Sequence, residues 1–88
     1  MNRKPDAIEV EVLFFARARD LAGKAKARLA LPAGATVAEA ARRIEEEFPG
    51  LGAQVRNCRI AVNEEFARAE DPVADRSVLA VIPPVSGG

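Results

Sequence analysis

The chain ends in Val78-Leu79-Ala80-Val81-Ile82-Pro83-Pro84-Val85-Ser86-Gly87-Gly88, where an apolar run gives way to prolines and then to glycines. The short continuous apolar run of residues 78–82 predicts a buried strand. Pro83 and Pro84 end this strand, because neither can donate a ladder hydrogen bond and each has a nearly fixed φ. A stiff segment that ends in two residues without a Cβ can enter a channel too narrow for side chains. Six extended residues span roughly 20 Å, so we expect the fold to present a tail that places the Gly88 carboxylate inside a partner's active site.

The composition is typical of one small globular domain. The chain has 88 residues, of which 49% are hydrophobic, enough for a single core. We expect a disordered leader over residues 1–7, a domain over 8–82 and the extended tail over 83–88. The 13 basic and 13 acidic residues leave no net charge, which argues against nucleic acid or a membrane surface as the main partner. No apolar run approaches the length needed to cross a bilayer.

Several residue types that carry chemistry are missing. The chain has no histidine, tyrosine or tryptophan and only one cysteine, which excludes a four-ligand zinc site and the Ser-His and Cys-His nucleophile pairs. We expect no metal site, no bound cofactor and no catalysis by the chain alone. A single cysteine cannot form an intrachain disulfide, and the polar start of the chain lacks a signal peptide, so we expect a cytoplasmic location.

Alternating hydrophobicity predicts three further strands, all of which precede the strand at residues 78–82. Residues 8–15 alternate with period two and predict the first strand. Residues 24–31 predict an edge strand whose basic side faces solvent, because lysines discourage pairing at an edge. Residues 58–62 predict a third strand, and 66–67 a brief paired stretch after a turn at 63–65. Residues 16–23 predict a short helical connection that ends at a glycine.

The clearest helix begins at Thr36, which forms a capping box with Glu39. Five apolar residues then share one helix face: Val37, Ala40, Ala41, Ile44 and Phe48. The element order is β-β-α-β-β, and the most apolar strands are the first and the last. We therefore expect an α+β fold of the ubiquitin-like β-grasp type, in which one main helix packs on a mixed sheet and these two strands are parallel central neighbours.

Three features invite a functional interpretation that the residues do not support. Gly23-Lys24 lacks the other residues of a phosphate-binding loop. The acidic run of residues 45–47 is interpreted as solvated helix surface, because it has no convergent partners. Cys58 has the same strand parity as Ile60, so we interpret it as a small structural residue without a lowered pKa.

Four segments carry a resemblance to a known family. Their order and spacing resemble those of the small, sulfur-carrier subunits of molybdopterin synthase, which belong to the ubiquitin-like sulfur-carrier family. The segments are Leu13-Phe14-Phe15-Ala16, Arg19-Asp20 with Ala22-Gly23, Ala61-Val62-Asn63, and Pro83-Pro84-Val85-Ser86-Gly87-Gly88. The resemblance covers residues 8–88, and the Phe-Phe-Ala opening together with the Pro-Pro-Val-Ser-Gly-Gly ending makes it specific.

This resemblance implies a sulfur carrier of molybdenum cofactor biosynthesis. A ubiquitin-activating-like adenylyltransferase would use ATP to adenylate the Gly88 carboxylate, and a sulfur donor protein would supply the sulfur that makes it a thiocarboxylate. Gly87 and Gly88 leave the acyl carbon open to attack. The large synthase subunit would receive the threaded tail and use the sulfur to form the molybdopterin dithiolene, in a heterotetramer with two copies of each subunit.

The resemblance also implies a docking surface. An apolar surface at the base of the tail would bind both the activating enzyme and the large subunit, and its members here would be Phe15, Phe66 and Ile82. Ile82 departs from the aromatic residue often found before the two prolines. Arg19 matches a family position, and we expect it to anchor a loop or a partner contact. The tail residues in contact with partners would be Pro83, Pro84, Val85 and Ser86.

Two other functions remain open at this point. The chain resembles sulfur carriers of other pathways, which feed thiazole, tRNA thiolation or cysteine synthesis. A ubiquitin-like protein modifier is the second alternative, in which Gly88 would be joined to lysines of target proteins.

Overall fold

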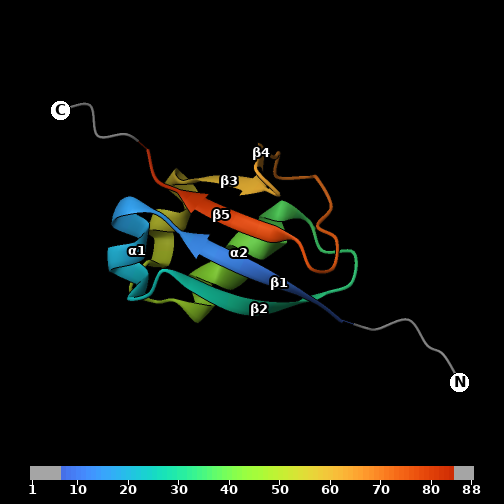
Figure 1. Ribbon diagram of the computed structural model, residues 1–88, viewed down its shortest axis with the longest axis horizontal. Coiled ribbons are helices and arrows are strands. Elements are labelled where there is room, and N and C mark those ends of the chain that lie inside the picture. The colour runs from blue at the N-terminus through green and yellow to red at the C-terminus, as the bar shows by residue number, and fades with distance from the viewer. Residues whose placement is uncertain (1–6, 85–88) are drawn as a thin grey trace, which may run out of the picture.

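The structure, a computed structural model, describes residues 7–84; the tail residues Val85–Gly88 and the leader residues 1–6 lie outside this range. It contains five strands and three helices. A single mixed sheet has the strand order β2-β1-β5-β3-β4, and α2 packs across one of its faces (Figure 1). The elements are β1 (Ala7–Phe14), α1 (Ala16–Ala22), β2 (Lys26–Pro32), α2 (Val37–Glu47), η1 (Gly52–Asn57), β3 (Arg59–Val62), β4 (Glu65–Phe66) and β5 (Val78–Ile82).

The first and last strands are parallel neighbours at the centre of the sheet, which confirms the predicted β-grasp arrangement. Glu11 lies opposite Val78 and Phe14 lies opposite Val81, so β1 and β5 end at the same edge. β2 pairs antiparallel with β1 at one side, and β3 pairs antiparallel with β5 at the other. Because β5 is the last strand, the chain leaves the sheet at the edge where α1 begins (Figure 1).

Helix α2 begins with the predicted capping box. The Glu39 amide donates to Thr36 Oγ1 at 3.2 Å, and the Thr36 amide donates to Glu39 Oε1 at 2.9 Å. These bonds satisfy backbone donors that have no partner within the helix. The inward face of α2 is buried through Val37, Ala40 and Ile44, so the helix covers one face of the sheet and leaves the other open.

The core lies between α2 and the sheet. Its fully buried members come from alternate positions of β1, β2 and β5 and from the elements that cover the sheet, as strand geometry requires. The largest side chains among them are Leu31, Ile44, Leu51, Leu79, Val10, Val12 and Val81. Phe14 and Phe48 extend the core toward α1 as an edge-to-face pair with ring centroids 4.9 Å apart. Within residues 7–84, no helix is long and apolar enough to cross a membrane.

Several boundaries differ from those expected. β1 begins at Ala7, one residue before the expected domain start, because Ala7 lies opposite Pro32 in the ladder with β2. β2 begins at Lys26 rather than at residue 24, since the chain must first reverse after Gly23, whose φ of 81° ends α1. β4 pairs over Glu65–Phe66 instead of 66–67, because the turn before it needs only Asn63 and Glu64, with φ of 51° and 75°.

Candidate functional site

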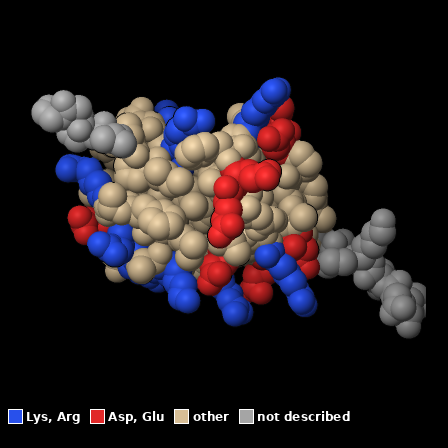
Figure 2. Space-filling view, turned by 45° about the horizontal axis from the view of Figure 1, so that its top comes forward, with Lys and Arg blue, Asp and Glu red and all other residues tan. Residues whose placement is uncertain are grey.

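The open face of the sheet carries an apolar hollow that runs along β5, from its first residue Val78 to its last residue Ile82. Its other side chains come from the end of β1, from β3, β4 and the turn between them, and from the residue that precedes α1. The hollow is lined by Leu13, Phe15, Ala61, Asn63, Glu64, Phe66, Val78, Ala80 and Ile82. Figure 2, which is turned by 45° from the view of Figure 1, shows a broad uncharged area on this side, with most charged side chains around its border. We call this site the apolar hollow.

Two aromatic rings stand out from the apolar hollow. Phe15 is 46% exposed and Phe66 is 59% exposed, and these are the two exposed large hydrophobic residues between residues 7 and 84. Phe15 follows β1 with extended backbone and caps α1, so its side chain continues the outward parity of Leu13. The structure thus brings Phe15, Phe66 and Ile82, which lie far apart in the sequence, to one surface. Exposed aromatic residues in a hollow are typical of protein-binding surfaces.

Arg59 is a residue of this surface that sequence reasoning missed. Its guanidinium carbon lies 4.1 Å from the centroid of the Phe66 ring, a cation–π contact that contributes about 0.5–1 kcal/mol at an exposed site. Arg59 shares strand parity with Ala61, which lies opposite Phe66. This parity could have indicated that Arg59 and Phe66 share one face of the sheet. That inference requires the register in which β3 and β4 pair, which the sequence did not provide.

A second hollow lies between α1 and η1, where the chain passes from β5 into the tail. Phe15 and Ile82 border both hollows, and the described part of the tail contributes Pro83 and Pro84 to this one. Its full lining is Phe15, Ala16, Arg17, Ala18, Leu21, Leu51, Gln54, Cys58, Ile82, Pro83 and Pro84. The base of the tail therefore stands between two surfaces that contain apolar side chains.

Cys58 lines the second hollow without the properties of a nucleophile. Its thiol donates to the carbonyl oxygen of Gln54, with Sγ 3.4 Å from the oxygen. Burial raises the pKa of the Cys58 thiol above its ordinary value, because a thiolate is poorly solvated there. The part of the chain that the structure describes contains no group of histidine, cysteine and acidic residues that could hold a metal ion.

Arg19 lies apart from both hollows. It is exposed on α1, and its carbonyl oxygen accepts the Gly23 amide at 2.9 Å, which closes the helix. This bond belongs to the backbone and would form with any residue at position 19. A partner contact by the Arg19 side chain stays a prediction.

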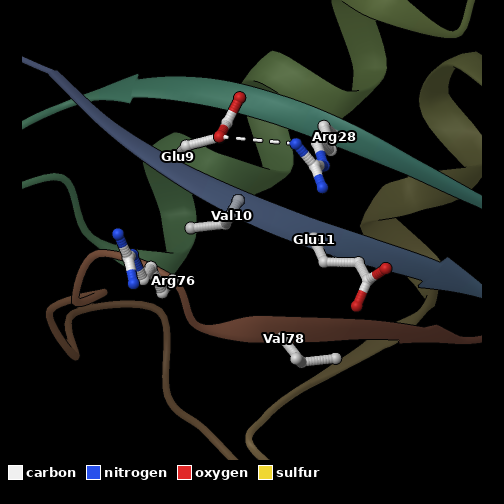
Figure 3. Close-up of a pocket in the computed structure, with 6 residues that line it drawn as sticks. All are labelled: Glu9, Val10, Glu11, Arg28, Arg76 and Val78. Carbon is white, nitrogen blue, oxygen red and sulfur yellow. Dashed lines mark ion pairs between the residues drawn. The ribbon is translucent and has the colours of Figure 1, made fainter.

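The opposite end of the open face is charged. Figure 3 shows a hollow there, lined by Glu9, Val10, Glu11, Arg28, Arg76 and Val78. The carboxylate of Glu9 lies 3.9 Å from the guanidinium of Arg28, and Glu11 lies 3.9 Å from Lys26. Such exposed pairs contribute little to stability, about 0–1 kcal/mol. Lys26 and Arg28 lie on the exposed basic side predicted for the edge strand β2, and Val78 borders both this charged hollow and the apolar hollow.

The fold and this surface define the class of protein. A β-grasp sheet whose last strand runs parallel to the first and leads out beside an apolar hollow is a ubiquitin-like fold, and 26 solved chains match this chain at high significance. SAMP1 from Haloferax volcanii has a TM-score of 0.83 at 28% identity, with 91% of this chain and 99% of that chain covered. A complex of subunits 1 and 2 of molybdopterin-converting factor from Helicobacter pylori contains a chain that matches with a TM-score of 0.62 at 29% identity. The match covers 92% of this chain and 100% of that chain.

Sequence comparison identifies the family. The model of the ThiS family matches residues 12–88, so this chain belongs to the ThiS family of ubiquitin-like sulfur carriers. The molybdopterin synthase sulfur carrier subunit of Arabidopsis thaliana is 41% identical over 83 residues, with 93% of this chain and 85% of the relative covered. The subunit of the same name from Chlamydomonas reinhardtii is 34% identical over 83 residues, with 92% of this chain and 100% of the relative covered.

Proposed function

We propose that this chain is the sulfur carrier subunit of molybdopterin synthase and acts in molybdenum cofactor biosynthesis. The observation that carries the proposal is its 41% identity, over 93% of its length, to a subunit of that name. The apolar hollow supports it, because a carrier needs a surface on which partners hold the base of its tail. The Gly-Gly ending supports it as well, since the chemistry requires an unhindered carboxylate.

The chemistry takes place on the terminal main chain. A carboxylate oxygen of Gly88 attacks the α-phosphorus of ATP, pyrophosphate leaves, and an acyl-adenylate forms. Sulfur at the oxidation level of sulfide then attacks the acyl carbon. The carbon–oxygen bond to AMP breaks, AMP leaves with the former carboxylate oxygen, and Gly88 ends in a thiocarboxylate. A carboxylate cannot undergo this exchange without activation, which is why ATP is consumed.

The catalytic groups belong to the partners. A ubiquitin-activating-like adenylyltransferase binds ATP, a sulfur donor protein supplies sulfur, and the large synthase subunit transfers it to the pterin precursor to form the dithiolene. This division fits a chain without histidine and with one unactivated cysteine. In the cytoplasmic synthase, two carriers and two large subunits form a heterotetramer.

The apolar hollow is the surface that the large subunit holds in this proposal. Phe15, Phe66 and Ile82 enter apolar pockets of the partner. The tail continues from there through Pro83, Pro84, Val85, Ser86 and Gly87, so that Gly88 reaches the large subunit's active site. The solved Helicobacter pylori complex of subunits 1 and 2 supports a two-subunit assembly of this kind.

Intact mass spectrometry tests the carrier function. The purified chain is incubated with ATP, an adenylyltransferase and a sulfur source, with ATP omitted in the control. We expect a mass gain equal to the exchange of one oxygen for one sulfur, located at Gly88 by fragmentation. The sulfur should then be lost when the large subunit and the pterin precursor are added. A competent adenylyltransferase that produces no such gain would contradict the proposal.

A second candidate is a ubiquitin-like protein modifier. It is favoured by the likeness to SAMP1, a solved protein of the same fold; small archaeal modifier protein is the name of a further solved neighbour from the same organism. The same mass experiment separates the two functions if target proteins are present. A modifier yields species heavier by a whole carrier, with Gly88 linked to target lysines, whereas a sulfur carrier yields the thiocarboxylate.

A further inference from the structure

Arg59 begins β3 on the open face of the sheet, beside the base of the tail. Its neighbour Ile60 is buried against the core, so the alternation of side chains along a strand directs Arg59 to the opposite face. In the antiparallel register Arg59 lies opposite Ile82, which directly precedes Pro83. An exposed cation therefore stands where the chain leaves the sheet, next to the apolar hollow.

Arg59 and Phe66 form one composite surface. The guanidinium carbon lies 4.1 Å from the ring centroid, so the planar group covers one face of the ring. A stacked guanidinium keeps N–H donors at its edge that can bond a further group. A partner that receives the Phe66 ring must therefore also meet the edge of the Arg59 guanidinium.

The charge of Arg59 has no counterpart in the described chain. No carboxylate between residues 7 and 84 lies within salt-bridge distance of it. At the other end of the same face, Lys26 and Arg28 pair with Glu11 and Glu9. A partner that covers Phe66 removes water from Arg59, and a desolvated cation without an opposite charge is unfavourable. Charge complementarity therefore requires an anionic group on the partner.

We propose that Arg59 is a specificity-determining residue for docking. The partner receives the Phe66 ring in an apolar pocket and places one Asp or Glu carboxylate against the Arg59 guanidinium. The inference rests on the proposed function, because it takes the large synthase subunit as that partner. The phosphate of ATP is not the anion, since it reacts at Gly88, six residues beyond Ile82, and six residues in an extended conformation would span roughly 20 Å, beyond the reach of one arginine side chain.

Binding measurements with charge-specific variants test this proposal. Arg59→Met removes the charge but keeps an unbranched side chain that packs on an aromatic ring, and Arg59→Lys restores the charge. Arg42→Met is the matched control, because Arg42 is exposed on α2. Titration calorimetry with the purified large subunit gives Kd at low salt and at about 1 M salt, where the Debye length falls to about 3 Å. Thermal unfolding checks that every variant is folded.

We expect Arg59→Met to weaken binding by roughly tenfold or more at low salt. The difference should shrink at high salt, and Arg59→Lys should regain most of the low-salt affinity, while Arg42→Met binds like the unaltered chain. Equal affinities of Arg59→Met and Arg42→Met would overturn the proposal. A loss of the same size at both salt concentrations would also overturn it, because packing rather than charge would then be the cause. Failure of the unaltered chain to bind would instead contradict the proposed function.

Discussion

The amide of Phe15 donates a hydrogen bond to the carbonyl oxygen of Val81, with the two atoms 3.2 Å apart. This bond extends the parallel pairing of β1 and β5 by one residue beyond the strand end. It holds an exposed aromatic ring beside Ile82, one residue before the prolines of the tail. The surface at the base of the tail is therefore positioned by the backbone of the central strand pair, and changes to its side chains should alter binding without altering the fold.

Phe66→Lys should weaken binding to the large subunit by roughly tenfold or more, because it replaces a ring with a charge in an apolar contact. It also places a second cation beside Arg59. Ala38→Lys is the matched control, since it adds the same charge at an exposed position of α2. Titration calorimetry measures both affinities. If the two variants bind equally well, Phe66 is not part of the interface.

Deletion of Gly88 should abolish sulfur transfer, because the carboxylate would then end on Gly87 and fall short of the activating site by one residue. The thermal unfolding temperature should be nearly unchanged, since the core within residues 7–84 loses no contact. Calorimetry measures the unfolding temperature, and the mass assay measures the sulfur gain. A truncated chain that still gains sulfur, or one that unfolds, would refute this assignment.

Thr36→Ala should lower the free energy of unfolding by about 1 kcal/mol, because the Glu39 amide loses the Thr36 hydroxyl as its acceptor. Thr36→Ser keeps an acceptor oxygen and should retain most of that stability. Urea unfolding of the three proteins measures the differences. Docking should be unaffected, because Thr36 lies in neither hollow at the base of the tail. Equal stabilities of the Ala and Ser variants would show that the cap contributes nothing.

Cys58→Ser should leave the sulfur gain at Gly88 unchanged in the mass assay, because the thiol takes no part in the chemistry.

Burial raises the pKa of Cys58 in the folded chain above its ordinary value of 9.0. The folded state thus binds a proton that the unfolded state loses first, so the contribution of this thiol is complete below pH 9.0 and declines above it. The unaltered chain should therefore lose more stability than the Ser variant between neutral and alkaline pH. Identical pH profiles would contradict the raised pKa.

Most helices and strands of this fold can be predicted from local sequence patterns. The alternation along residues 8–14, the Thr36–Glu39 cap and the apolar face of α2 are interactions between residues close in the chain, so they can be read without a structure. The central position of β1 and β5 followed from their apolarity, and their parallel direction from the long connection between them. Boundaries were less accurate, because the start of β1 at Ala7 and the end of β2 at Pro32 depend on their pairing with each other.

The candidate site divides in the same way. By itself the sequence supplied the prolines and terminal glycines on which the prediction for the tail rests, and its family resemblance implied that Phe15 and Phe66 are docking residues. Only the tertiary structure decided that these rings share a hollow with Ile82, that Arg59 lies over Phe66, and that Arg19 lies elsewhere. The physical reason is that strand register joins residues far apart in the chain. A shift of one residue in the register of β3 or β4 would move Arg59 or Phe66 to the other face of the sheet.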